Sequence, residues 1–195
     1  MAVSIKSARE IELMREAGKR LAHVHQELEA MIAPGISTWE IDAKGEKLIR
    51  DCGCIPNFLH YNGYPASICV SVNDEVVHGI PRKDRYLKEG DIVSLDAGLI
   101  YEGYHSDAAR THAVGEISPE ARKLVEVTRQ AFFEGIKYAK AGHHLHEISA
   151  AIGAYAESFG YGVVRDLVGH GIGTHLHEDP AVPNFAQPSR GVRLQ

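Results

Sequence analysis

The sequence predicts an α+β domain built from two related halves, and three observations carry this prediction. Four segments carry apolar residues at three- and four-residue steps, which is the pattern of amphipathic helices. Short runs of β-favouring residues follow each pair of helical segments. The third and fourth helical segments repeat the first and second after 107 residues. We therefore expect strands of both halves to meet in a shared sheet, with the helices covering one side.

Capping boxes mark the two helices of the first half. Ser7 followed by Glu10 predicts one helix start, and the apolar positions of that helix continue to Met31. A second box at Ser37 predicts another helix, which we expect to end near Gly53. Beyond it, residues 67–72 predict a strand, residues 76–80 a second extended piece, and residues 91–95 the first arm of a hairpin.

The second half begins with a third helix. Ser118 followed by Pro119 is typical of a helix start, and the pattern continues to about Ala139. A fourth helix is expected from about Leu145 to Phe159. The apolar side chains that we expect the third helix to bury are Leu124, Val127, Ala131 and Phe132.

The repeat aligns the glycines that break the helical segments. Gly35 falls on Gly142 and Gly53 on Gly160. We interpret residues 1–195 as one domain with halves of about 1–111 and 112–195. Fewer residues follow the helices in the second half than in the first, so we expect a C-terminal segment with further strands to be missing.

Composition excludes several classes of protein. The net charge is −5 and Lys and Arg form no run, which argues against a nucleic-acid binder. No apolar run approaches the ~20 residues of a membrane span. Three cysteines without a paired motif suggest neither a disulfide framework nor a structural zinc site. We expect a cytoplasmic protein.

Two carboxylates, Asp96 and Asp107, stand eleven positions apart in a strand-like stretch. A hairpin with the four-residue loop 100–103 would place them directly opposite each other, with Cβ atoms ~5 Å apart. Like charges so placed are destabilising. A divalent cation bound between the two carboxylates would offset their repulsion, so the pair could form a metal-binding site. The alternative is a solvated hairpin with two unrelated carboxylates.

A glycine-rich loop at residues 169–180 follows the β-like stretch 161–168 and carries His170 and His177. Its alternating glycines permit a close backbone approach. The spacing of the two histidines is not that of a zinc-binding helix, so we expect a loop to bring them to a site. A tight turn with incidental histidines is the alternative.

Taken together, the Asp hairpin, the glycine-rich loop and residues 73–81 resemble type I methionine aminopeptidase over essentially the whole chain. Prolidase and aminopeptidase P share the hairpin and the loop, but they normally carry an upstream domain. Residues 73–81 also favour the methionine enzyme. The resemblance implies a single catalytic domain with the pita-bread fold, in which two pseudo-symmetric halves surround a shared antiparallel sheet.

The resemblance further implies an enzyme that removes the initiator methionine from nascent peptides by metal-activated water hydrolysis. It implies that Asp96, Asp107 and His170 bind metal, that His78 contacts the scissile amide, and that His177 contacts the carbonyl oxygen. The family holds two divalent ions, and mixed carboxylate and imidazole ligands do not choose among Co, Mn, Fe and Zn. A monomer that meets peptides at the ribosome is the expected form. The pocket residues implied for the substrate are Phe58, Tyr61, Tyr64, Cys69 and Leu176.

The resemblance stops at residue 195, before the two glutamates that complete the family's metal centre. The alternatives are therefore a catalytically incomplete form that only binds peptide or a partner, and a prolidase-like exopeptidase. Any role of His175 in the glycine-rich loop is left open. His23 and His25 in the first helix are expected to be surface or packing residues, and those at 143–146 incidental.

Overall fold

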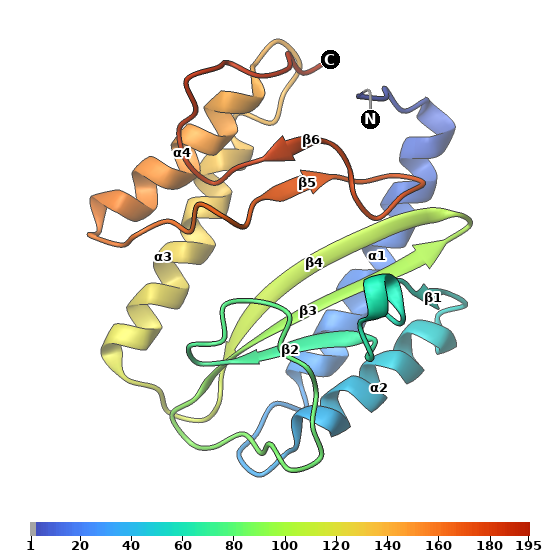
Figure 1. Cartoon of the computed structure of the whole chain (residues 1–195), viewed down its shortest axis with the longest axis vertical. Coiled ribbons are helices and arrows are strands. Elements are labelled where there is room, and N and C mark those ends of the chain that lie inside the picture. The colour runs from blue at the N-terminus through green and yellow to red at the C-terminus, as the bar shows by residue number, and fades with distance from the viewer. Residues whose placement is uncertain (1–2) are drawn as a thin grey trace. The chain divides into compact units, whose positions relative to one another are not determined.

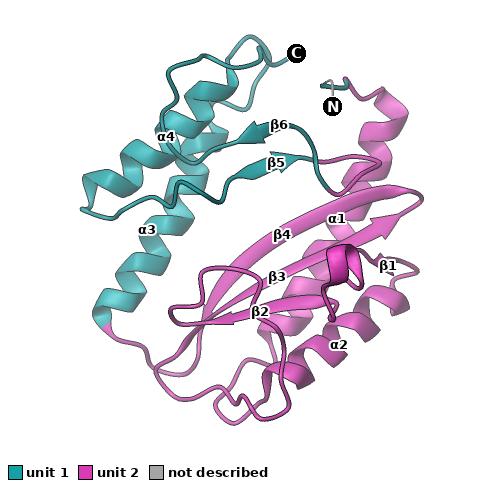
Figure 2. Ribbon diagram, viewed as in Figure 1, with its two compact units in different colours: residues 1–4, 119–171, 177–195 teal, residues 5–118, 172–176 magenta. Residues whose placement is uncertain are grey.

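The structure is a computed structural model, and it describes residues 3–195 (Figure 1). By internal packing the chain divides into two compact units (Figure 2). Unit 2 holds residues 5–118 and 172–176, and unit 1 holds residues 119–171 and 177–195 together with residues 3–4. The interpretation of the chain as one domain with halves meeting near residue 111 stays a prediction.

Two helices of unit 2 begin at the predicted capping boxes, α1 (Ala8–Glu29) and α2 (Thr38–Asp51). The Glu10 carboxylate accepts the Ser7 backbone N–H at 2.7 Å, and Glu40 accepts that of Ser37 at 2.8 Å. In each box the serine hydroxyl in turn accepts the backbone N–H of the glutamate. The reciprocal bonds satisfy backbone donors that a helix start leaves unpaired.

The sheet of unit 2 is antiparallel and centred on β3 (Ile92–Tyr101). β4 (Tyr104–Ala113) pairs with one side of β3, while β2 (Ile68–Val72) and the short β1 (Ile55–Pro56) pair with the other. A turn of 3-10 helix, η1 (Tyr61–Gly63), precedes β2. In Figure 1 the two helices of this unit cover one face of its sheet.

The two faces of this sheet have different chemistry. Strand residues alternate between faces, and the odd positions of β3 are buried against α1 and α2 in the main core. These positions are Val93, Leu95, Ala97 and Leu99. The even positions, which include Asp96 and Gly98, lie on the opposite face. The helices therefore leave the acidic face of the sheet uncovered within unit 2.

Two expectations about this region are wrong. Residues 76–80 form no strand, because His78 adopts a left-handed backbone conformation with φ of 59°. The β3–β4 hairpin turns through two residues rather than four, since Tyr101 pairs with Tyr104. Glu102 and Gly103 both have positive φ, 48° and 83°, as the tight turn that matches strand twist requires.

Unit 1 contains the helices α3 (Pro119–Ile136) and α4 (Leu145–Ser158) and a small hairpin of β5 (Gly169–Gly171) and β6 (Glu178–Val182). Residues 161–168, expected to be β-like, contain no strand. The repeat predicts a shared sheet, whereas the described strands form a four-stranded sheet in unit 2 and a two-stranded sheet in unit 1.

The predicted buried face of α3 is half right. Val127 and Ala131 are buried, but Leu124 and Phe132 are 39% and 56% exposed. The helix that packs against α3 within unit 1 is α4, so the side chains of α3 that point away from α4 stay open to solvent. None of the helices within residues 3–195 is long and apolar enough to cross a membrane.

Candidate metal centre and substrate pocket

Asp96 and Asp107 lie on one face of the β3–β4 hairpin. Asp96 pairs with Ala109, and Asp107 pairs with Gly98. The predicted direct pairing of the two acids is therefore wrong by two positions, because the turn is two residues shorter. An even displacement keeps both side chains on the same face as diagonal neighbours, within reach of each other.

The electrostatics of this pair fit a divalent cation. Burial, the charge of Asp107 and a hydrogen bond to Asp107 raise the pKa of Asp96 to about 8. Two carboxyl groups so placed cannot both ionise without cost. A divalent cation removes this cost, and carboxylate oxygens are ligands that such ions accept. Asp96 and Asp107 are therefore suited to hold a metal together.

An apolar cluster borders the acidic pair. Phe58, Cys69 and Leu176 are buried together, with Tyr64 and Ile172 packed against them. Cys69 is the β2 residue paired directly with Asp96, so the cluster begins beside the first carboxylate. The structure therefore brings four of the five predicted pocket residues into one cluster.

The polar groups of this cluster are neutral at physiological pH. Burial raises the pKa of the Cys69 thiol to about 12, and burial also raises the pKa of Tyr64. The Tyr64 hydroxyl donates to the carbonyl oxygens of Ile68 and Gly79, at 3.2 and 2.9 Å. Tyr61, the fifth predicted pocket residue, is 39% exposed and lies outside the cluster.

His78 is held in an uncommon backbone conformation. Its neighbour Gly79 donates its N–H to the Ser71 hydroxyl at 3.0 Å, and the Gly79 carbonyl accepts the Val70 N–H at 2.9 Å. A Cβ atom at position 79 would lie 2.2 Å from the Val70 carbonyl oxygen, so this approach requires glycine. A non-glycine residue held at positive φ is uncommon and is often found at functional sites. The exposed side chain of His78 is thus presented from a fixed backbone.

In unit 1, His170 lies on β5 and His177 directly precedes β6. Their rings are 4.1 Å apart between centroids. The Nδ1 atom of His170 lies 2.8 Å from the Gly171 carbonyl oxygen. That carbonyl can only accept, so Nδ1 carries the proton and Nε2 is left as the basic nitrogen. A histidine that donates one ring nitrogen to a carbonyl is typical of metal ligands.

No three His, Cys, Asp or Glu side chains within residues 3–195 form a group able to hold a metal ion. Each unit by itself contributes a pair, the two aspartates in unit 2 and the two histidines in unit 1. The pairing of His170 with the aspartates therefore remains a prediction from the resemblance.

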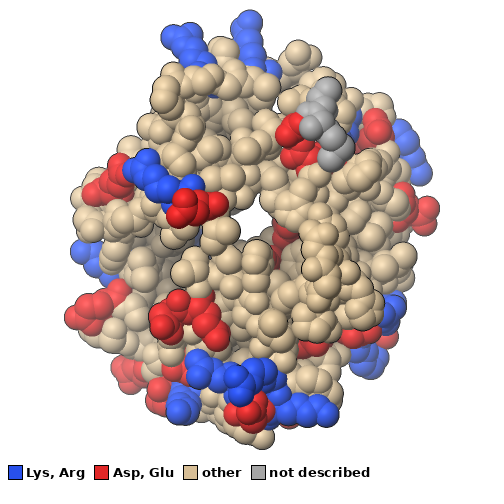
Figure 3. Space-filling model, in the orientation of Figure 1, with Lys and Arg blue, Asp and Glu red and all other residues tan. Residues whose placement is uncertain are grey.

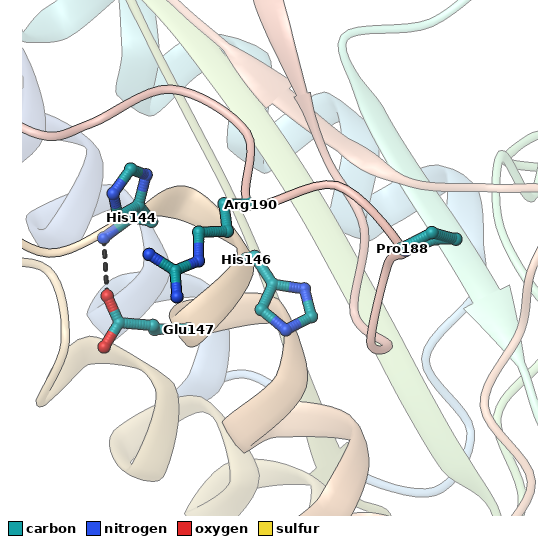
Figure 4. A pocket seen from close by; sticks show the side chains of 5 residues that line it. All are labelled: His144, His146, Glu147, Pro188 and Arg190. Carbon is teal, nitrogen blue, oxygen red and sulfur yellow. Dashed lines mark hydrogen bonds between the residues drawn. The ribbon is translucent and has the colours of Figure 1, made fainter.

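The histidines at 143–146 have local structural partners. His144 precedes α4, and its N–H donates to Glu147 at 2.6 Å, while the His146 ring accepts the Gln187 N–H at 3.2 Å. His144 and His146 line a pocket of about 470 Å³ together with Glu147, Pro188 and Arg190 (Figure 4). Because the Glu147 carboxylate already occupies the helix start, this pocket offers no open anion site. His25, as predicted, is a packing residue and is 1% exposed.

The model of metallopeptidase family M24 matches residues 12–195. The chain belongs to metallopeptidase family M24. A curated member, the methionine aminopeptidase of Clostridium acetobutylicum, is 53% identical over 98% of this chain and 77% of its own length. The structure of the methionine aminopeptidase from Thermotoga maritima superposes with a TM-score of 0.96 at 43% identity, covering all of this chain and 78% of that one.

Other M24 enzymes are more distant. Prolidase from Pyrococcus furiosus has a TM-score of 0.80 and 25% identity, and it covers 94% of this chain but 53% of its own. These neighbours confirm the predicted pita-bread fold and the predicted resemblance to methionine aminopeptidases.

One residue of the acidic face escaped sequence reasoning. Asn57 is buried beside Gly98, the residue paired with Asp107. Its only sequence signal is a polar residue next to the predicted pocket residue Phe58. Nothing in the pattern indicates that Ser106, 49 positions away, would be its neighbour.

Proposed function

We propose that this M24 metallopeptidase removes the N-terminal methionine from peptides by metal-dependent hydrolysis. The observation that carries the proposal is the placement of a half-buried acidic pair next to a neutral apolar cluster on one sheet face. This arrangement offers a metal site beside a pocket for an uncharged side chain. The methionine aminopeptidases, at 53% and 43% identity, give the substrate class.

In this proposal Asp96, Asp107 and His170 are ligands of a divalent-metal centre, which in the family holds two ions among Co, Mn, Fe and Zn. When bound, the metal supplies a Lewis acid that polarises the scissile carbonyl and acidifies a water molecule. His177 donates a hydrogen bond to the carbonyl oxygen of the substrate, and His78 contacts the scissile amide. Such positioned donors stabilise the charge that develops on the carbonyl oxygen.

The pocket selects methionine by shape and polarity. Phe58, Tyr64, Cys69 and Leu176 present carbon, sulfur and a hydroxyl already committed to backbone carbonyls. An unbranched thioether finds favourable contacts with aromatic rings and thiols. A charged side chain would lose its hydration there without gaining a partner. Tyr61 is proposed to contact the substrate from the rim.

We also propose that the protein acts in the cytoplasm, as a monomer, on nascent peptides at the ribosome. All three cysteines are free thiols, as is usual in a reducing compartment. Figure 3 shows basic and acidic side chains intermingled on the face in view. This mixture is unlike the basic surface that direct binding of nucleic acid requires.

The test is release of methionine from a Met-Ala-Ser peptide by the purified protein loaded with Mn²⁺ or Co²⁺. Asp96→Asn should abolish release, because it removes a charged ligand while keeping the shape of the side chain. An unchanged rate in this variant would refute the metal assignment. Cleavage of an Xaa-Pro peptide in preference to Met-Ala-Ser would instead show a prolidase-like enzyme. Tight Mn²⁺ binding without turnover would show a form that only binds.

A further inference from the structure

We infer that Asn57 is a positioning residue that holds Asp107 in place for metal binding, an inference that rests on the proposed function. The register of the sheet places the two residues in one row. Asn57 follows β1, whose pairing with β3 continues as the Asn57 N–H donates to the Gly98 carbonyl at 3.4 Å. Gly98 in turn pairs with Asp107 on β4. The row across the acidic face therefore runs Asn57, Gly98, Asp107.

Gly98 leaves room for the Asn57 amide to cross β3. A Cβ atom at position 98 would lie 2.2 Å from the Asn57 Oδ1 atom and 2.8 Å from Nδ2. Any side chain at position 98 would therefore collide with the amide. The missing side chain lets Asn57 reach over the central strand to the strand that carries Asp107.

The donor side of the amide is directed at the two residues before Asp107. The Asn57 Nδ2 atom lies 3.4 Å from the Ser106 carbonyl oxygen and 3.2 Å from the His105 Nδ1 atom. It also lies 3.5 Å from the Leu99 carbonyl oxygen on β3. Because carbonyl oxygens only accept, these contacts fix which end of the amide carries the protons.

The Oδ1 atom of Asn57 indicates that a contribution to stability does not by itself explain why an asparagine stands at this position. Asn57 is 6% exposed, and its Oδ1 atom has no hydrogen-bond partner among residues 3–195. A buried unpaired acceptor lowers stability. A side chain that only packed the sheet would do better without that oxygen. The arrangement is explained if the donor contacts next to Asp107 matter for metal binding.

The same contacts connect the acidic pair to the pocket. His105, which Asn57 contacts through its ring, donates its backbone N–H to the Gly173 carbonyl at 2.8 Å. Gly173 lies three residues before Leu176, a member of the apolar cluster. Asn57 therefore steadies the backbone on both the metal side and the pocket side of the site in unit 2.

The experiment compares metal binding by Asn57→Leu, Asn57→Ala and Ser94→Ala. The leucine variant keeps the shape of the side chain and removes the donors, whereas the alanine variant removes both. Ser94→Ala is the matched control, because Ser94 also joins β3 to β4, through a 2.8 Å contact with the Thr111 hydroxyl four residues beyond Asp107. Titration calorimetry with MnCl₂ gives the affinity, the visible spectrum of the Co²⁺ form reports ligand geometry, and thermal unfolding without metal gives stability.

We expect both Asn57 variants to bind Mn²⁺ about 10–100-fold more weakly than the wild type, the usual effect of removing a residue that orients a metal ligand. Their Co²⁺ spectra should change, while Ser94→Ala keeps the wild-type affinity and spectrum. Unchanged affinity in both Asn57 variants overturns the inference and leaves the proposed function intact. If one variant fails to fold, the other decides. If the wild-type protein itself binds no Mn²⁺, the proposed function fails and this inference fails with it.

Discussion

The helix pairs α1–α2 in unit 2 and α3–α4 in unit 1 have the same backbone frame. α4 occupies the positions of α2 shifted by 107 residues at both ends. Backbone hydrogen bonds around the start of the second helix of each pair also repeat after 107 residues. They join this region to a later segment of the same unit. The repeated bonds run from Gly35 to Leu87 and Gly142 to Leu194, and from Thr38 to Arg85 and Leu145 to Val192, each from N–H to carbonyl at 2.8–3.0 Å.

The side chains at the helix crossing are exchanged between the two pairs. Gly45 on α2 lies against Ile68 of β2 and Leu28 of α1, where a Cβ atom would be 2.4 Å from the isoleucine and 3.6 Å from the leucine. The positions 107 residues later are Gly135 on α3 and Ile152 on α4, and a Cβ atom on Gly135 would lie 2.5 Å from that isoleucine. The large residue has moved to the other helix. Turns and caps therefore preserve the backbone arrangement, while the large and the small residue at the crossing stand in either order. At Gly45 the close neighbour is Ile68 of the sheet, whereas at Gly135 it is Ile152 of the facing helix.

Equivalent positions on α1 and α3 differ in how far they are buried. His25 on α1 is 1% exposed, whereas Phe132, its counterpart after 107 residues, is 56% exposed. α1 packs against β3 and β4, and His25 accordingly lies 2.9 Å from the Ala108 carbonyl. α3 packs on α4 within its unit. Burial thus depends on what covers a helix face and not on the polarity of the residue there.

Breaking the helix crossing should have the largest effect. Gly135→Leu inserts a second large side chain opposite Ile152 and should cost about 1–3 kcal/mol of unfolding free energy, as overpacking usually does. Adding Ile152→Gly recreates the order of the first pair. The loss in the double variant should then be smaller than the sum of the two single losses. Urea unfolding of all four proteins measures the coupling, and strict additivity would contradict the exchange.

The buried histidine should make the α1 side sensitive to acid. Burial lowers the pKa of His25, with the charges of Arg110 and His112 adding to the effect and Glu29 and the Ala108 carbonyl opposing it. The folded state then binds fewer protons than the unfolded state, so stability should fall as the pH drops below the ordinary histidine pKa of about 6.5.

His25→Gln should therefore reduce the slope of unfolding free energy against pH between about pH 7 and 5, the range below the ordinary histidine pKa. Part of the slope should remain, because burial also lowers the pKa of His112. Phe132→His is the matched control, since an exposed histidine titrates alike in both states and should leave the slope unchanged. Equal slopes for wild type and His25→Gln would show that protonation of His25 does not cause the pH dependence of the unfolding free energy.

The smallest expected effect concerns the helix starts. Ser37 completes the capping box of α2 with a hydroxyl 3.2 Å from the Glu40 N–H, and His144 holds that position before α4. His144→Ser should raise the unfolding free energy by about 0.5–1 kcal/mol, because serine caps a helix start well. The reverse change, Ser37→His, should lower it by a similar amount. Thermal unfolding of the two variants measures both changes. If serine at position 144 gives no gain, the contact of His144 with the Gly191 carbonyl stabilises the protein as much as a serine cap would.

Sequence reasoning reached most of the proposed site. It placed Asp96 and Asp107 in one hairpin and grouped Phe58, Tyr64, Cys69 and Leu176 as pocket residues. These inferences depend on residue types and spacing that resemble a family. It failed on the hairpin register, because a turn of two or four residues satisfies the same pattern. It also failed at residues 76–80, where the contacts of Gly79 with β2 override a run of residues that favours a strand.

The sequence by itself determined the four helices and the membership in family M24. Capping boxes and glycine breaks act over a few residues, so they can be recognised in the sequence. Only the tertiary structure decided that Asp107 lies opposite Gly98, that the Asn57 amide contacts β4 from the segment after β1, and that His25 is buried while Phe132 is exposed. The contacts of the Asn57 amide span 42 to 49 residues. Contacts of that range depend on strand register and on the covering of each face, which no local pattern encodes.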